Sequence, residues 1–262
     1  MGIKTFIDQM GSPVKISDPP KRIISLVPSQ TELLADLGLD NEVMGITKFC
    51  IHPGHWRRDK AVVGGTKNFH FDRIHRLHPD LIIGNKEENY QEGIEQLRQH
   101  YPVWMSNVTT PDDAFNMILE VGKITKREVA AETLTSAIRK SWEGMIQLPS
   151  LHVLYLIWRK PWMGAALGTF IDSMINVSGL KNCLFNHSRY PELSEEEIQS
   201  LNPDLVFLSS EPYPFREDHI HELKTILPAS KIMLVDGEMF SWYGSRLRLF
   251  ADYIKKLRSQ VM

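Results

Sequence analysis

Aromatic side chains stand beside charged residues and glycine in two short segments of the second half of the chain. One reads WRKPW, residues 158–162, and the other reads MFSWYGSR, residues 239–246. A protein core disfavours this mixture, because burying an unpaired charge costs several kcal/mol. Aromatic faces and the planar guanidinium of arginine suit a large planar ligand with polar edges. The two segments therefore favour a ligand-binding site, and ordinary loop packing is the alternative.

The segment FCIHPGHW, residues 49–56, brings Cys50, His52 and His55 close together. Cysteine and histidine can bind a metal or form a nucleophilic pair. Pro53 prevents a regular helix here, and the segment supplies neither a carboxylate nor a third histidine to complete a ligand set. We expect a structural or ligand-facing loop, and the sequence predicts neither a metal site nor a catalytic triad.

Uninterrupted apolar runs predict the strands that position these polar segments. Residues 81–84 and 205–208 read LIIG and LVFL, without the alternation of a half-exposed strand. Such runs indicate burial on both faces, as in a parallel sheet covered by helices. Ligands of these sheets bind beyond the carboxyl ends of the strands. The residues that follow predicted strands include Phe49 in the first half and Trp158, Ser209, Glu211 and Tyr213 in the second.

The segment RIISLVPSQTELLADLGL, residues 22–39, predicts a strand followed by a helix. Ser29 has the side chain of a helix N-cap residue, and Gly38 is a typical helix stop. The segment GTFIDSMINVSGL, residues 168–180, looks like its counterpart in the second half, with Gly179 in place of Gly38.

One phrase occurs twice in the chain. IHRLHPDLIIG begins at residue 74 and IQSLNPDLVFL begins at residue 198, an offset of 124 residues. In each copy the proline separates a short helix from a strand, because proline disfavours helical geometry in the residue before it. In a chain of 262 residues, the repeat predicts two similar α/β lobes, each a mainly parallel sheet flanked by helices.

The stretch between the two halves has helical periodicity and few turn residues. Thr125 and Glu128 have the spacing of a capping box, so we expect a helix from Thr125 to about Gln147. Such a helix of about 22 residues would be about 33 Å long and could link two lobes. The predicted division is an N-terminal lobe over residues 1–109, a linking segment over 110–149 and a C-terminal lobe over 150–262.

The composition is that of a globular protein with a substantial core. Hydrophobic residues make up 42% and charged residues 24% of the chain, and the formal net charge is −2. This balance argues against nucleic acid as a partner, since binding a polyanion needs clustered Lys and Arg. No apolar run approaches the roughly 20 residues that span a bilayer, so we expect no membrane insertion. The first residues also lack a signal-peptide pattern, which leaves a cytoplasmic protein or a removed export signal.

Four segments together resemble the substrate-binding proteins of ABC importers for cobalamin, iron-siderophores and haem. They are RIISLVPSQTELLADLGL, VVGGTKNFHFDRIHRLHPDLIIG, GTFIDSMINVSGL and LSEEEIQSLNPDLVFLSS, and they are most similar to the cobalamin-binding branch. The resemblance implies a non-enzymatic, monomeric receptor that holds cobalamin or a related corrinoid in an interlobe cleft. It also implies a membrane permease as partner, no intrinsic cofactor, and a periplasmic or cell-surface location.

The resemblance also implies roles for individual residues. One exposed acid on each lobe docks onto the permease, and the matching positions are Asp72 and Glu196, again 124 residues apart. Aromatic and polar side chains of both lobes hold the ligand. The matching residues are Phe49, Trp158, Arg159, Trp162, Glu238, Phe240, Trp242, Tyr243 and Arg246.

Two alternatives stay open at the level of sequence. Haem would need an axial Tyr or His, and an anionic siderophore would need several converging arginines; Arg159 and Arg246 are available, without an obvious cluster. The other alternative is a cytoplasmic enzyme or sensor that uses the receptor fold.

Overall fold

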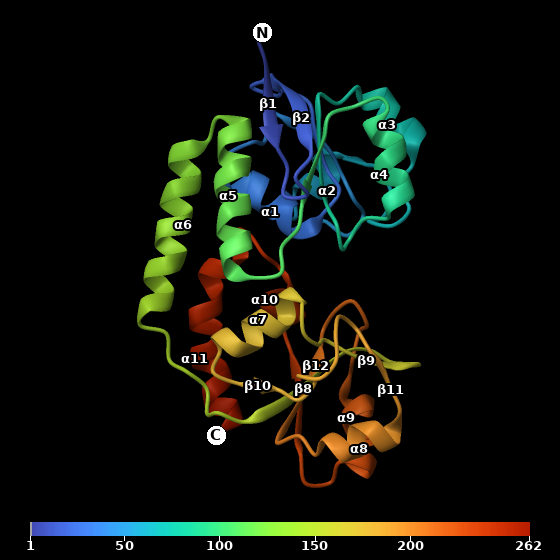
Figure 1. The fold of residues 1–262 in the computed structure, drawn as a ribbon, viewed down its shortest axis with the longest axis vertical. Coiled ribbons are helices and arrows are strands. Elements are labelled where there is room, and N and C mark those ends of the chain that lie inside the picture. The colour runs from blue at the N-terminus through green and yellow to red at the C-terminus, as the bar shows by residue number, and fades with distance from the viewer. Residues whose placement is uncertain (1) are drawn as a thin grey trace. The chain divides into compact units, whose positions relative to one another are not determined.

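The computed structural model describes residues 2–262, and the chain divides into two compact units (Figure 1). Unit 1 holds residues 2–108, 112–139 and 243–246, and unit 2 holds residues 109–111, 140–242 and 247–262. The chain therefore passes from one unit to the other several times. The boundaries at residues 109 and 149 stay a prediction.

Unit 1 is built on a parallel sheet of five strands in the order β5-β4-β3-β6-β7. The strands are β3 (Ile23–Ser25), β4 (Val43–Ile46), β5 (Ala61–Val62), β6 (Leu81–Asn85) and β7 (Val103–Ser106). Every residue of β3, β6 and β7 is buried. The expected parallel sheet covered on both faces is thus confirmed.

Six helices and a hairpin complete unit 1. The helices are α1 (Pro28–Asp36), α2 (Trp56–Asp59), α3 (Phe71–Leu77), α4 (Gln91–Arg98), α5 (Pro111–Thr125) and α6 (Glu128–Glu143), of which α6 belongs to unit 1 up to Arg139. Strands β1 (Gly2–Ile7) and β2 (Pro13–Asp18) pair as an antiparallel hairpin. Figure 1 shows α5 and α6 as two long neighbouring helices.

The helix expected from Thr125 to about Gln147 is wrong in its start, its end and its cap. Thr125 is the last residue of α5, and its hydroxyl donates to the carbonyl of Val121 at 2.7 Å. Lys126 then adopts a positive φ of 59°, which interrupts the helical path. Because the Thr125 hydroxyl is used inside the preceding helix, α6 starts without it at Glu128.

Unit 2 contains a mixed sheet of six strands in the order β11-β9-β8-β12-β13, with β10 paired to β8. Its central pairs, β8 with β12 and β12 with β13, are parallel. The strands are β8 (His152–Trp158), β9 (Trp162–Gly164), β10 (Lys181–Asn182), β11 (Glu192–Leu193), β12 (Leu205–Ser209) and β13 (Lys231–Val235). The helices are α7 (Phe170–Val177), α8 (Glu195–Leu201), α9 (Glu217–Ile226), α10 (Gly237–Ser241) and α11 (Phe250–Val261). The 3₁₀ helix η1 (Ser245–Leu249) precedes α11, and its first two residues belong to unit 1.

Helix α1 begins two residues earlier than the sequence predicts, at Pro28 instead of Gln30. Pro28 occupies its first turn, a position where the missing amide hydrogen and the fixed φ of proline are tolerated. The N-cap position falls on Val27, so the expected cap by Ser29 is wrong. Gly38 and Gly179 follow α1 and α7 with φ of 74° and 94°, which confirms both as helix stops.

The repeated aspartates fix the start of a neighbouring strand in each unit. Asp80 accepts the backbone N–H groups of Lys21 and Arg22, both at 2.8 Å, directly before β3. Asp204 accepts the N–H of His152, the first residue of β8, at 2.7 Å. Since β3 pairs with β6 and β8 pairs with β12, each aspartate joins its own strand to the partner strand.

The repeated isoleucine anchors a helix to each core. Ile74 of α3 and Ile198 of α8 are fully buried and pack in the main apolar cluster of their own unit. In unit 1 this cluster includes Ile24, Ile82 and Val103 of the sheet, and in unit 2 it includes Leu154, Val206 and Ile232.

Across residues 2–262 we find no helix with the length and apolar character that crossing a bilayer requires.

Candidate functional site

A half-exposed aromatic ring stands at the carboxyl edge of the unit 1 sheet. Phe49 lies in the loop after β4, and half of its surface is exposed, 50%. The ammonium group of Lys48 lies 4.9 Å from the centre of the Phe49 ring. A Cβ atom added to Gly65 would come within 3.3 Å of this ring, so glycine lets the turn at residues 64–68 lie against it. The ring is thus both supported and open to solvent.

Buried amides hold together the loops at this edge. Asn85, the last residue of β6, donates to the hydroxyl of Ser106 at 2.9 Å. The Asn89 amide donates to the carbonyl of Thr66 at 2.9 Å and accepts the N–H of Asn85 at 2.9 Å. These bonds link the ends of β6 and β7 with the turn after β5, which makes the edge a defined surface.

Tyr243 and Arg246 belong to unit 1, although they follow unit 2 residues in the chain. Arg246 holds Glu32 of α1 through two bonds, Nε to Oε2 at 2.8 Å and Nη2 to Oε1 at 2.7 Å. The Tyr243 hydroxyl donates to the Glu88 carboxylate at 3.2 Å, and burial raises the pKa of Tyr243 well above its ordinary value. Both side chains are therefore engaged with acids of unit 1.

Cys50 faces the interior. Its sulfur lies 3.0 Å from the Thr31 hydroxyl and 3.2 Å from the Thr47 hydroxyl, and burial raises the pKa of the thiol. A buried thiol that stays protonated is a weak nucleophile and a poor metal ligand. Among residues 2–262, no three His, Cys, Asp or Glu side chains gather where they could hold a metal ion.

An aromatic cluster lies at the carboxyl ends of β8 and β12 in unit 2. Trp158, the last residue of β8, is 39% exposed and meets Tyr213 edge to face with ring centres 5.5 Å apart. Tyr213 packs against Phe215, which stacks in turn on the buried Trp162. We call Trp158, Trp162, Tyr213 and Phe215 the unit 2 aromatic cluster.

Arg159 packs against the Trp162 ring of the unit 2 aromatic cluster. Its guanidinium lies 4.3 Å from the centre of the Trp162 ring, and its Nε lies 3.1 Å from both carboxylate oxygens of Glu222 in α9. The pair is mostly buried on the arginine side, and its hydrogen bonds lower the pKa of Glu222. The charge of Arg159 is thus already balanced within unit 2.

Glu211, in the loop after β12, holds the indole that follows α10. Its Oε1 accepts the Trp242 Nε1–H at 2.8 Å and the Ser241 hydroxyl at 2.7 Å. Burial raises the pKa of Glu211, and the charges of Glu238 and Asp236 raise it further, whereas the two hydrogen bonds lower it. Trp242 is itself buried, whereas Glu211 is only partly buried.

Phe240 is fully buried in unit 2. Its ring lies 5.3 Å from Tyr155, 6.0 Å from Phe207 and 5.8 Å from Phe250, centre to centre. Its neighbour Glu238 is only partly buried, in the first turn of α10, and donates its N–H to the Asp236 carboxylate at 3.1 Å. Helix α10 therefore has an inner face that packs and an outer face that Glu238 occupies.

The structure groups the nine sequence-predicted ligand residues by unit. Trp158, Arg159 and Trp162 form one group, Glu238, Phe240 and Trp242 lie around α10 in the same unit, and Phe49, Tyr243 and Arg246 belong to unit 1. Two residues at the carboxyl edge of unit 2 received no ligand role from the sequence. Glu211 and Tyr213 lie in the loop after β12, and this position beyond the carboxyl end of a strand is the sequence feature that could have identified them as ligand residues.

A family model described as periplasmic binding protein matches residues 23–226 of the chain. The chain belongs to the periplasmic binding protein family. Periplasmic binding proteins are non-enzymatic transport receptors, so the enzyme alternative is wrong and the expectation of a substrate-binding receptor is confirmed.

Individual relatives extend this likeness over most of the chain. A vitamin B12-binding protein of Pectobacterium carotovorum subsp. carotovorum (strain PC1) is 24% identical over 248 residues, 90% of this chain and 87% of the relative. The uncharacterized ABC transporter substrate-binding lipoprotein YvrC of Bacillus subtilis (strain 168) is 24% identical over 215 residues, 77% of this chain and 68% of the relative. The solved periplasmic heme-binding protein RhuT from Roseiflexus sp. RS-1 superposes with a TM-score of 0.81 at 20% identity, over 92% of this chain and 99% of that chain. This structural match shows the fold.

In this periplasmic binding protein, Asp72 and Glu196 occupy equivalent exposed positions. Each is the second residue of its helix, α3 or α8. The Ser194 hydroxyl accepts the Glu197 N–H at 3.2 Å, and the Glu197 carboxylate accepts the Ser194 N–H at 2.7 Å. This reciprocal cap occupies Glu197 and leaves Glu196 exposed beside it. The docking role of the two acids stays a prediction.

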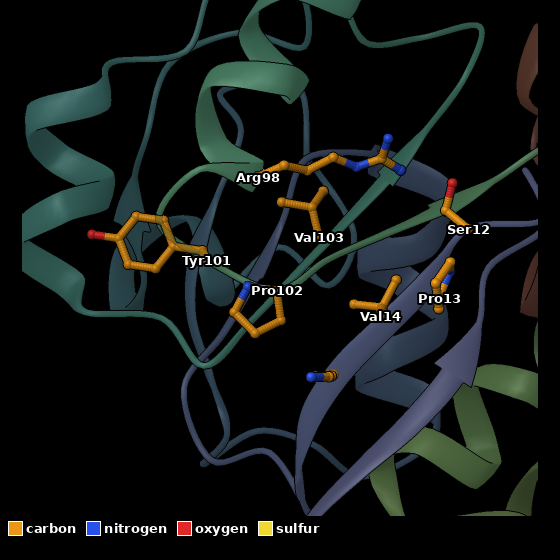
Figure 2. A pocket seen from close by; sticks show the side chains of 8 residues that line it. Ser12, Pro13, Val14, Arg98, Tyr101, Pro102 and Val103 are labelled. Carbon is orange, nitrogen blue, oxygen red and sulfur yellow. The ribbon is translucent and has the colours of Figure 1, made fainter.

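A cavity of about 520 Å³ lies elsewhere in unit 1, and Figure 2 shows it from close by. Its lining residues are Ser12, Pro13, Val14, Lys15, Arg98, Tyr101, Pro102 and Val103. In Figure 2 the Arg98 side chain reaches toward Ser12, and its Nη2 lies 2.9 Å from the Asp8 carboxylate. Because β7 begins at Val103, the cavity lies at the amino end of that strand, whereas ligands of parallel sheets bind at the carboxyl ends.

Proposed function

We propose that this periplasmic binding protein binds cobalamin or a related corrinoid and delivers it to the permease of an ABC importer. One observation carries the proposal: each unit has a partly exposed aromatic ring at the carboxyl edge of its parallel strands. These rings are Phe49, 50% exposed, and Trp158, 39% exposed. Aromatic faces stack on flat macrocycles, and this edge is where α/β sheets bind ligands.

The charges at these edges also support a corrinoid. Corrinoids carry amide groups at the rim, whereas haem and ferric siderophores present carboxylates or other anionic groups. Arg159 is held by Glu222 and Arg246 by Glu32, each through two-point contacts within its own unit. Neither arginine therefore offers an unbalanced positive charge to an anionic ligand. The relative named vitamin B12-binding protein, matched over 90% of this chain, points in the same direction.

We divide the sequence-predicted ligand residues by their burial. Phe49, Trp158 and Glu238 are proposed to touch the ligand, since each retains exposed surface. The others are proposed to support these contacts. Arg159 is partly exposed but held by Glu222. The remaining residues are buried, and they are Trp162, Phe240, Trp242, Tyr243 and Arg246. Asp72 and Glu196 are proposed to dock onto arginines of the permease, which places the protein in the periplasm or at the cell surface.

Haem is the second candidate, and Tyr213 is the observation in its favour. Its phenol lies at the carboxyl end of β12, the position of a possible axial ligand, and its oxygen is 3.1 Å from Nε2 of His219. The Arg216 N–H donates to Nδ1 of His219 at 3.0 Å, so Nε2 carries the ring proton and donates to the phenol oxygen. The same hydrogen bond would stabilise a phenolate bound to iron.

Separate fluorescence titrations with each candidate ligand distinguish the two proposals. The purified chain is mixed with cyanocobalamin, haemin and a ferric siderophore, and quenching of tryptophan emission is followed at increasing concentrations. We expect saturable quenching by cyanocobalamin, with Trp158 close to the coloured macrocycle. Preferential saturation by haemin would support the second candidate and overturn the first.

A further inference from the structure

The two carboxylate oxygens of Glu211 differ in their surroundings: Oε1 is hydrogen-bonded, and Oε2 is not among the fully buried unbonded oxygens of residues 2–262. Its Oε1 accepts both the Trp242 indole N–H and the Ser241 hydroxyl, as described above. Among residues 2–262 no donor is bonded to Oε2, and Glu211 keeps exposed surface. The inner bonds fix the orientation of the carboxylate, so Oε2 is held in a defined direction at the carboxyl edge of β12.

The charged groups that act on Glu211 are acids. Glu238 and Asp236 both disfavour its ionised form, and they come from α10 and from the residue that caps α10. The arginine at the end of the adjacent β8, Arg159, is bound to Glu222 instead. This part of the unit 2 edge is thus rich in carboxylates, which are hydrogen-bond acceptors.

We infer that Glu211 selects a ligand whose rim carries amide N–H groups and rejects one whose rim carries carboxylates. An amide N–H can donate to Oε2, and a hydrogen bond to a charged partner contributes more than a neutral one. A carboxylate at the same place would meet Oε2 as a like charge and would leave both groups without a donor. The inference rests on the proposed function for the site and adds the chemical class of rim group that the site accepts.

Cyanocobalamin and its isomeric monocarboxylates, in which one rim amide has been hydrolysed, give the direct test. Calorimetry with the wild-type chain should show at least one isomer binding about tenfold more weakly than cyanocobalamin, the size expected for one charge-assisted hydrogen bond. In Glu211→Gln the new amide can donate to that carboxylate, and the penalty should fall to about threefold or less. Glu217→Gln removes a charge from an exposed residue of α9 in the same unit, and it should keep the wild-type penalty.

The result that overturns the inference is a set of monocarboxylates that all bind the wild type as well as cyanocobalamin does. An equal penalty in the wild type and Glu211→Gln would overturn it too. If Glu211→Gln does not fold, Glu211→Asp keeps the charge but withdraws the oxygen, and the penalty should shrink there as well.

If the corrinoid proposal is wrong, the same titrations give a different result. A wild-type chain that binds haemin and not cyanocobalamin would contradict the corrinoid proposal alone. Haemin is then compared with haemin whose two propionates have been converted to amides. The inference predicts that the wild type binds the diamide about tenfold more tightly than haemin. Equal affinities for haemin and its diamide would contradict the inference.

Discussion

Glu32 and Arg246 are 214 residues apart in the chain and form a two-point ion pair inside unit 1. Only 12% and 9% of their side-chain surfaces are exposed. Arg246 ends the short segment 243–246, which unit 2 residues flank on both sides. The ion pair therefore anchors that segment to α1.

Replacing Arg246 by Leu should strongly destabilise the protein, because Glu32 would keep its charge in a nearly buried position. We expect the free energy of unfolding to fall by about 3 kcal/mol, as for other buried pairs that lose one partner. Urea unfolding followed by circular dichroism measures the change. The control is Glu120→Gln, which breaks the more exposed pair with Lys123 and should cost less than about 1 kcal/mol. Equal effects of the two substitutions would contradict the structural role of the pair.

The repeated aspartates should differ in their contribution to stability. Asp80 accepts two backbone N–H groups and Asp204 accepts one. Asp80→Ala should therefore cost about 2 kcal/mol and Asp204→Ala about 1 kcal/mol, at roughly 1 kcal/mol per hydrogen bond. Thermal and urea unfolding of both variants give the comparison. A larger loss for Asp204→Ala would show that the number of bonds does not set the effect.

Removing the exposed rings should weaken ligand binding without unfolding the protein. We expect Phe49→Ala and Trp158→Ala each to raise the dissociation constant of cyanocobalamin about tenfold or more, since aromatic anchors contribute about 1–3 kcal/mol. Isothermal titration calorimetry measures the constants. Val129→Ala, at a residue that is 77% exposed on α6, is the control and should bind as the wild type does. Unchanged affinity in both aromatic variants would remove these rings from the site.

The stability of Glu211→Gln relative to the wild type should depend on pH. Burial raises the pKa of Glu211 in the folded protein above its ordinary value of 4.5. Between these two values the folded state binds more protons than the unfolded state, so this residue makes the wild type less stable as pH rises through that window. The variant has no such group, and its stability relative to the wild type should improve over the same window. Urea unfolding at a series of pH values tests this, and a pH-independent difference would contradict the raised pKa.

Reversing the charge of both Asp72 and Glu196 should abolish ligand uptake by cells without changing the affinity for the ligand. In Asp72→Lys with Glu196→Lys, we expect cells to lose uptake of the ligand while the purified variant binds cyanocobalamin with wild-type affinity. Both residues are exposed at the second position of a helix, so folding should tolerate the changes, at a cost below about 1 kcal/mol per helix from the helix dipole. Transport by the double variant at the wild-type rate would end the docking proposal.

The parts of the fold that local patterns determine were predictable. The runs of β6 and β12 are apolar without alternation, and the repeated Leu-x-Pro-Asp-Leu marks a helix end and a strand start in both units. Thr125 shows where local patterns fail, because its hydroxyl can cap the next helix or bond back to Val121, and spacing does not decide between these.

The position of Arg246 in unit 1 and the hydrogen bonding of Glu211 could not be predicted from the sequence. Sequence spacing suggested that residues 239–246 act together, but Tyr243 and Arg246 pair with acids of unit 1. Glu211 gains its fixed orientation from the Trp242 indole, 31 residues away. Neither relationship has a local signal, since each depends on which side chains the folded chain brings together.

Titration of cyanocobalamin into the purified chain, followed by calorimetry, tests the corrinoid proposal most directly. We expect one saturable site per chain with a dissociation constant of about 1 μM or below. The same titration with haemin should give weaker binding. The absence of saturable binding of cyanocobalamin up to about 1 mM, with saturation by haemin, would contradict the proposed function.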